Sequence, residues 1–285
     1  MSQDHRLQQQ RFELKYLVPE GVTLYIRDFV RCYLELDDFG VGMPNYSYPV
    51  HSVYLDSDDL KTHQATINGT KNRFKLRLRY YDDRPNTPVF FEVKGRVDNC
   101  ILKQRCGVRR DAVPLLLGGQ LPDPAHLLSR ESRHLVALQR FHLLMTQLNG
   151  KPKAHNSYLR EAWVSAHDNS VRVTFDRNVR IEPWSRLEAP VSFRKPFRVY
   201  ADVTILELKF TNRFPNWFRE LVETFGLMQF AAAKYAEGVV AIGEHHFHNG
   251  EKPLDSQGAT AYPVIPYDWA PESFANVGAA EALYD

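Results

Sequence analysis

One stretch of the sequence, Phe74 to Arg79, constrains the fold more than any other because its two faces require different surroundings. It reads Phe-Lys-Leu-Arg-Leu-Arg, and side chains alternate along a β-strand with a period of two residues. One face therefore carries Phe and Leu, and the other carries Lys75, Arg77 and Arg79. The apolar face predicts burial against a core, whereas the basic face predicts contact with anions.

The same alternation returns along the chain, so several strands share this plan. They are expected at residues 11–15, 74–79, 91–96, 101–105, 171–176 and 206–210, and residues 154–165 and 171–179 are expected to form a hairpin. Two architectures fit: an open sheet with a charged outer face, or a closed barrel with the charges inside. Apolar segments of helical period lie between the strands and need a surface to cover, which the apolar strand faces supply. This favours the barrel, with helices packed outside.

In such an interior, the many Lys and Arg side chains would repel one another. Unpaired buried charge costs several kcal/mol per group, so the interior is expected to hold water, acids and a polyanion. The formal net charge is only +2, with 36 basic and 34 acidic residues in 285. A focused basic site with a phosphate-rich ligand is therefore predicted, and a wholly basic binder of nucleic acid is not.

The chain is expected to hold one domain at residues 10–246, between a flexible N-terminus (1–9) and a C-terminal tail (247–285) rich in Pro, Gly and acids. The cysteines have no metal-type spacing, and a reducing cytoplasm is the default for such a chain. The N-terminus is polar and no long apolar run occurs, so neither a signal peptide nor membrane insertion is expected.

Helices are predicted from Pro19, from the Asp56–Ser57 pair to about Ile67, over 123–148, from Pro215 to Gly226, and over 231–243. The acids at 56–59 lack the glycine and later glutamate of a calcium loop, so a helix cap is the favoured interpretation. Three histidines, His245, His246 and His248, stand near the tail without an evident carboxylate partner and are expected to be solvated.

Eight segments in order resemble the VTC domain, the polyphosphate polymerase domain of the vacuolar transporter chaperone family, within the CYTH or triphosphate-tunnel superfamily. They are Arg-Phe-Glu-Leu-Lys-Tyr (11–16), Val-Tyr-Leu-Asp (53–56), Lys-Leu-Arg-Leu-Arg (75–79), Phe-Glu-Val-Lys (91–94), Asn-Ser-Tyr-Leu-Arg (156–160), Val-Arg-Val-Thr-Phe-Asp (171–176), Leu-Glu-Leu-Lys (206–209) and Lys-Tyr (234–235). The resemblance implies an α+β fold, a closed antiparallel eight-stranded β-barrel with helices outside. It also implies binding of ATP or another triphosphate, and transfer of the γ-phosphate to inorganic polyphosphate.

Carried over to this sequence, the resemblance implies two sets of phosphate-handling residues. The candidate catalytic residues are Lys234, Arg77, Arg79, Lys94 and Arg160, and the candidate phosphate-binding residues are Lys15, Lys75, Lys103, Arg105, Tyr158 and Arg172. Arg binds phosphate oxygens as a bidentate fork, whereas Lys acts as a point charge. Phosphoryl transfer needs mainly positioning and charge neutralisation, which these groups supply.

The resemblance also makes Glu207 the metal-binding carboxylate, with Mn²⁺ or Mg²⁺ as the cofactor and Glu13 as a candidate second ligand. Two alternatives stay open. Glu207 could be a counter-ion to Lys209 or to a facing Arg, because buried charge is usually paired. Glu13 and Glu92 could each be a second metal ligand or could hold basic neighbours in place, and for these two residues pairing is the favoured interpretation.

The sequence departs from the family pattern at Arg11, where the wider superfamily often has Glu, and at Ala233, where Ser commonly precedes Lys-Tyr. The first departure disfavours the hydrolase or cyclase chemistry of that branch, and the second removes one possible phosphate contact. No phosphate-sensing domain or membrane segment accompanies the domain, so translocation by this chain alone is not expected. Besides the polymerase, a triphosphatase and a non-catalytic polyphosphate-binding or nucleotide-binding module remain as alternatives.

Overall fold

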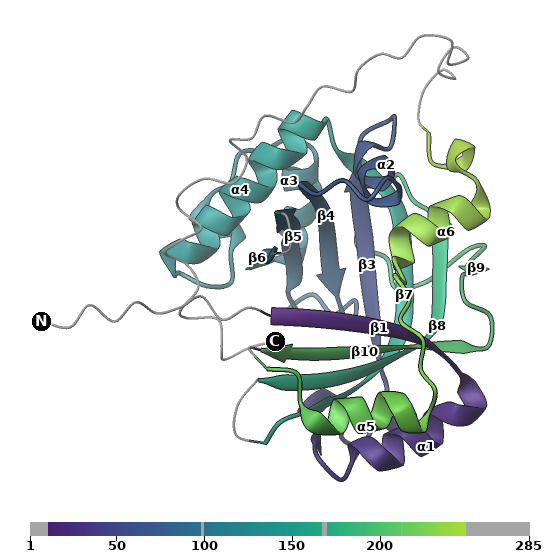
Figure 1. Ribbon diagram of the computed structural model, residues 1–285. Coiled ribbons are helices and arrows are strands. Elements are labelled where there is room, and N and C mark those ends of the chain that lie inside the picture. The colour runs from purple at the N-terminus through teal and green to yellow at the C-terminus, as the bar shows by residue number, and fades with distance from the viewer. Residues whose placement is uncertain (1–10, 98–99, 167–169, 212, 249–285) are drawn as a thin grey trace, which may run out of the picture.

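In the part of the chain that the structure describes, ten β-strands form a single antiparallel sheet that curves strongly and carries helices on its outside (Figure 1). The structure is a computed structural model that describes residues 11–97, 100–166, 170–211 and 213–248. The predicted flexible N-terminus (1–9) and most of the predicted tail (249–285) lie outside the described residues. Within the described ranges, every helix is too short or too polar to cross a bilayer.

The strands are β1 (Arg11–Pro19), β2 (Glu35–Leu36), β3 (Tyr48–Asp56), β4 (Arg73–Tyr80), β5 (Val89–Val97), β6 (Cys100–Val108), β7 (Lys151–Val164), β8 (Val171–Pro183), β9 (Phe197–Arg198) and β10 (Val203–Thr211). The order across the sheet is β1-β10-β8-β7-β3-β4-β5-β6, with short β2 and β9 attached to β7 and β8. The helices are α1 (Glu20–Val30), α2 (Lys61–Ile67), α3 (Val113–Leu117), α4 (Ser132–Leu148), α5 (Asn216–Thr224) and α6 (Lys234–Ile242). The predicted hairpin is confirmed by the pairing of β7 with β8.

The apolar strand faces point outward and lie under the helices, as predicted. One core joins Phe74, Leu76 and Leu78 of β4 to α3 and α4, and the ring of Phe91 meets that of Phe141 edge-on at 4.8 Å between centroids. A second core packs the outer faces of β1, β8 and β10 against α1 and α5. The opposite face of these strands, which we call the inner face, is left to the charged side chains.

The predicted closure of the barrel is not confirmed, because the backbone ladder of the described strands runs from β1 to β6 without joining these two ends. The free edge of β1 is instead occupied by the chain that follows α5. The amide of Phe230 donates to the carbonyl of Lys15 at 2.8 Å, and Tyr16 forms an isolated bridge with Gln229. Side chains nevertheless connect the two halves of the sheet, because Lys94 of β5 lies 3.3 Å from Glu13 of β1.

The long helix predicted over 123–148 is wrong for its first third. Asp123 accepts a hydrogen bond from the amide of Ala125 at 2.7 Å and caps a single 3₁₀ turn, Pro124–His126. Leu127 then forms a bridge with Val108 at the end of β6. The apolar residues that suggested a helical stripe therefore cover a strand edge in extended form, and α4 begins at Ser132.

The helix predicted from the Asp56–Ser57 pair begins later, at Lys61, with Leu60 at its N-cap position. The predicted role of Asp56 and Ser57 in capping its first amides is nevertheless confirmed. The Asp56 carboxylate accepts hydrogen bonds from the amides of Thr62 and His63 at 2.9 Å each, and the hydroxyl of Ser57 accepts from the amide of Lys61 at 3.0 Å. The same carboxylate accepts from the hydroxyl of Tyr235 at 3.0 Å. The cap of α2 therefore also anchors α6, whose first residue is Lys234.

A buried histidine pair lies between β3 and β7. Nδ1 of His51 and Nε2 of His155 are 3.1 Å apart, and the ring of His155 stacks on Phe193 at 4.1 Å between centroids. Burial, aided by the nearby charge of Arg180, lowers the pKa of His51 to about 4. Burial and the neighbouring imidazole lower the pKa of His155 to about 3.

We expect the free energy of unfolding to fall as the pH is lowered from about 6.5 to about 4. In this range the unfolded chain takes up protons that the buried pair does not, so acid favours the unfolded state. The substitution His51→Gln removes one titrating group and should reduce this pH dependence, measured by urea denaturation at several pH values. His245→Gln, at an exposed position, is the matched control; equal slopes for all three proteins would contradict the prediction.

Candidate functional site

Charged side chains from β1, β4, β5, β6, β7, β8 and β10 gather on the inner face, and α6 adds one more. They are Glu13, Lys15, Lys75, Arg77, Arg79, Glu92, Lys94, Lys103, Arg105, Arg160, Asp176, Glu207, Lys209 and Lys234. Alternation along the strands explains their common direction, since for most of these residues the apolar neighbours along the strand belong to the outer cores. The structure arranges most of them around a few buried carboxylates.

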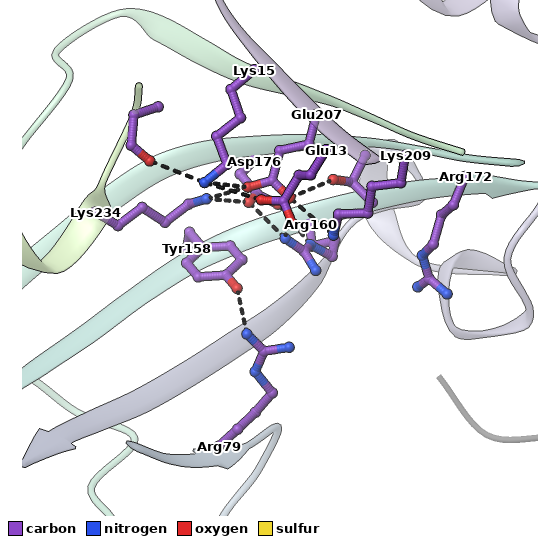
Figure 2. A network of polar contacts seen from close by, with 12 residues as sticks. Glu13, Lys15, Arg79, Tyr158, Arg160, Arg172, Asp176, Glu207, Lys209 and Lys234 are labelled. Carbon is purple, nitrogen blue, oxygen red and sulfur yellow. Dashed lines mark hydrogen bonds and ion pairs between the residues drawn. The ribbon is translucent and has the colours of Figure 1, made fainter. Parts of the chain in front are cut away.

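Glu207 is the centre of the first set of ion pairs (Figure 2). Its carboxylate lies 3.0 Å from Nζ of Lys234, 3.1 Å from that of Lys209 and 3.7 Å from that of Lys15, and 3.5 Å from Nη2 of Arg160. Burial raises the pKa of Glu207, but these cations outweigh it and hold the pKa well below its ordinary value. The predicted counter-ion role of Glu207 is thus present in the structure.

Asp176 is a second buried carboxylate beside Glu207. It accepts both arms of the Arg160 guanidinium, at 2.7 and 2.8 Å, and lies 2.6 Å from Nζ of Lys234. Burial lowers the pKa of Lys234, whereas Asp176 and Glu207 raise it, and the net shift is upward. Arg160 and Lys234 are therefore charged and fixed in position before any ligand arrives.

Glu13 extends these contacts across the two ends of the sheet. Its carboxylate lies 3.2 Å from Nζ of Lys15 and 3.3 Å from that of Lys94. Burial raises the pKa of Glu13, but Lys94 and Lys209 outweigh it, so the carboxylate is ionised. We call Glu13, Lys15, Lys94, Arg160, Asp176, Glu207, Lys209 and Lys234 the Glu207 cluster.

Glu92 is the centre of a separate set, the Glu92 cluster. Its carboxylate lies 2.5 Å from Nη2 of Arg77, 3.8 Å from Nε of Arg79, and 3.9 Å from both Nζ of Lys103 and Nη1 of Arg105. The Glu92 residue is fully buried. Burial raises its pKa, but Arg77 and Arg79 lead a larger opposing effect, so the net pKa is low.

Tyr158 lies between the two clusters. Its hydroxyl accepts from Nη2 of Arg79 at 3.4 Å, while Nζ of Lys234 and the guanidinium of Arg160 lie 4.9 and 5.2 Å from its ring centroid (Figure 2). A cation over an aromatic face is stabilised by the ring quadrupole. The predicted phosphate-binding hydroxyl is thus placed within reach of cations from both clusters.

Lys75 differs from the other cations because its ammonium has no hydrogen bond or ion pair with any residue that the structure describes. It stands directly opposite Lys94 in the pairing of β4 with β5. Burial first, and then the charges of Lys15 and Lys94, lower the pKa of Lys75 to about 7. A bound anion would stabilise the charged form of Lys75 and so offset both effects on its pKa.

Arg172, a predicted phosphate-binding residue, lies away from the ion pairs of the Glu207 cluster (Figure 2). Its Nη2 donates to Oδ2 of Asp37 at 2.8 Å, and Oδ1 of Asp37 accepts from the amide of Phe39 at 2.9 Å. Arg172 thereby positions the loop that follows β2.

The predicted metal ligands Glu207 and Glu13 fit a divalent ion only in part. Both are ionised and both contact Lys15, but each already has ammonium partners. In the ranges described, no three His, Cys, Asp or Glu side chains are grouped so as to hold a metal. Mg²⁺ is usually bound by one or two carboxylates together with substrate phosphates, so these residues fit an ion that arrives with a phosphate ligand.

A family model described as the VTC domain matches residues 10–242. The chain belongs to the VTC domain family. No curated protein matches its sequence.

Two solved structures are similar to this VTC domain in fold. A protein from Bacillus halodurans, provisionally described as an adenylate cyclase, is 13% identical, with a TM-score of 0.44 over 79% of this chain and 95% of its own. A protein from Pyrococcus horikoshii is 12% identical, with a TM-score of 0.40 over 81% of this chain and 96% of its own. Both similarities are low, so the family assignment depends on the family model.

Three inner-face residues of the VTC domain were not among the predicted site residues. Asp176 and Lys209 belong to the Glu207 cluster, and Glu92 is the centre of its own cluster. Each has the same alternation as the predicted site residues on its strand, so the period of two could have placed all three on the inner face. The sequence also suggested the pairing of Lys209 with Glu207 on the same strand, but not the partners of Asp176 and Glu92, which lie on other elements.

Replacing the carboxylate of Glu92 with a neutral amide should strongly destabilise the VTC domain. In Glu92→Gln, the cluster's arginines and lysines lose their buried counter-charge, and breaking a buried ion pair costs about 3–5 kcal/mol. Urea denaturation would measure the loss. Glu131→Gln, at a surface pair with Arg133, should change stability by less than about 0.5 kcal/mol; a similarly small effect at Glu92 would contradict the prediction.

Proposed function

We propose that this VTC domain is an ATP-dependent polyphosphate polymerase that binds a triphosphate on its inner face and transfers the γ-phosphoryl group to a polyphosphate chain. The observation that supports the proposal best is the imbalance of charge on that face. Lysines and arginines outnumber the carboxylates that neutralise them, and Lys75 has no acidic partner within the described ranges. An excess of buried positive charge is compensated most directly by a ligand with several negative charges.

The ligand's phosphates would replace carboxylates as partners of the same cations. Arg77, Arg79 and Arg160 offer guanidinium forks that match two phosphate oxygens. Their carboxylate contacts hold them in place beforehand, so little reorganisation is needed when charge develops in the transition state. Lys234, at the first turn of α6, supplies a point charge at the junction of Asp176, Glu207 and Tyr158.

A divalent ion, Mg²⁺ or Mn²⁺, is part of this proposal. Glu207, with Glu13 as its neighbour across Lys15, would hold the ion jointly with phosphate oxygens. When bound, such an ion neutralises charge on the phosphates and orients them. The protein's own contribution is to keep both carboxylates ionised, which the surrounding lysines achieve.

The direct test incubates the purified protein with ATP and either Mg²⁺ or Mn²⁺ and measures long-chain polyphosphate and free phosphate in the same samples. We expect polyphosphate to accumulate, and Glu207→Gln to reduce the rate at least about tenfold, as loss of a metal-site partner does. Glu220→Gln, at an exposed position on α5, is the matched control and should retain the wild-type rate.

The balance of products decides between the proposal and its rivals. Free phosphate without chains would show a triphosphatase, in which water replaces the polyphosphate acceptor. Tight binding of triphosphate without either product would show a binding module. Both outcomes would contradict the polymerase while leaving the inner face as the binding site.

Binding of inorganic tripolyphosphate should weaken as the pH rises through about 7, because the Lys75 ammonium loses its proton near this pH in the free protein. Above this value, binding must bring a proton with it, which costs at most about tenfold in affinity per pH unit. Lys75→Arg keeps the charge and should flatten this part of the profile, measured by calorimetry against pH.

Titration of the ligand itself affects all variants equally, so the comparison isolates Lys75. Lys71→Arg, at an exposed position just before β4, is the matched control and should follow the wild type. Parallel profiles for the wild type and Lys75→Arg would show that Lys75 does not contact the anion.

A further inference from the structure

Four aromatic side chains, which we call the aromatic cluster, gather beside the basic inner face. They are Phe39, Tyr48, Tyr81 and Phe90. The rings of Phe39 and Tyr81 are nearly parallel, 11° apart, with centroids separated by 6.2 Å. Tyr48 contacts both rings, at 5.7 and 6.2 Å, and Phe90 lies 6.4 Å from Tyr81. These residues come from three different strands or strand ends and one loop, so the fold assembles the cluster.

The aromatic cluster is continuous with the phosphate-handling cations. Phe90 pairs directly with Arg79 across β4 and β5, and the guanidinium of Arg105 lies 4.3 Å from the Phe90 ring centroid. Tyr48 pairs with Arg160 across β3 and β7. A ligand whose phosphates lie among these arginines would therefore extend over aromatic rings at this end of the inner face.

Phe39 has the properties of a binding residue more than those of a core residue. Its side chain is 64% exposed, whereas Tyr48 beneath it is 7% exposed. Its backbone is nevertheless held firmly, because Asp37 accepts from the Phe39 amide and is itself bound by Arg172 of β8. An exposed aromatic ring on a fixed backbone offers a face for stacking at low entropic cost.

We propose that the aromatic cluster is a subsite for the base of a nucleoside triphosphate, with Phe39 and Tyr81 as the stacking residues. The inference rests on the proposed function, since the phosphates must occupy the inner face for the base to reach the cluster. Every nucleobase has a π-face, so stacking here favours nucleoside triphosphates over inorganic triphosphate without selecting one base. Arg172 acts as a positioning residue, because it reaches the subsite through Asp37 and the loop.

The test compares the binding of ATP and of inorganic tripolyphosphate by calorimetry. Phe39→Ala and Tyr81→Ala should each weaken ATP binding about tenfold, as loss of a base-stacking aromatic does, and change tripolyphosphate binding less than about twofold. Tyr25→Ala, which removes a 68% exposed aromatic on α1, is the matched control and should change neither. A second variant, Phe39→Trp, should show fluorescence quenching with ATP and none with tripolyphosphate.

The two ligands separate the possible failures. Equal weakening of both would show that the cluster only supports the structure, and unchanged ATP binding would place the base elsewhere; either result overturns the subsite and leaves the proposed function standing. If the wild-type protein binds neither ligand, the proposed function and the subsite fail together.

Discussion

The structure depends on a few buried carboxylates that hold a larger number of buried cations. Glu207, Asp176 and Glu92 are almost inaccessible to solvent, and each has two or more Lys or Arg partners from different elements. Without them, the alternating strands would place like charges opposite one another, as Lys75 and Lys94 still are. The acids therefore do two things at once: they offset the repulsion between buried cations in the folded chain, and they fix the positions of these cations.

The local chemistry of one loop contributes to this arrangement over a long distance. Asp56 ends β3, caps α2 and accepts the hydroxyl of Tyr235. Since Lys234 is the preceding residue, a capping interaction that looks purely structural fixes the position of a cation in the Glu207 cluster. Similarly, Asp37 connects Arg172 on the sheet with Phe39 in a loop. In both cases an acid near the end of a strand holds a segment outside the sheet in a fixed position relative to the sheet.

Much of this could be predicted from the sequence. The period of two identified the charged strand faces and the apolar faces under the helices, and the order of the motifs identified the VTC domain. The predicted ends of helices were less accurate where tertiary contacts override a local pattern. Leu127 and its neighbours have helical spacing, but they cover the edge of β6. The closure of the sheet could not be settled from periodicity, because it depends on which chain segment reaches the free edge of β1. Lys209 pairs with Glu207 of its own strand, which is one of the pairings that the sequence suggested. The partners of Asp176 lie on β7 and α6, and alternation along one strand does not encode these contacts.

The contacts of Lys15 link the backbone on the outside of this edge to the charges inside. Its carbonyl accepts from Phe230, and its ammonium reaches the carbonyl of Ala232, Glu13 and Glu207. The backbone of Lys15 thus fixes the position of the segment that leads into α6, and the side chain of the same residue pairs with the buried carboxylates. Any shift of this segment along β1 moves Lys234 and disturbs the Lys15 contacts in one step, so a mechanical displacement at the edge of the sheet changes the electrostatic potential on the inner face.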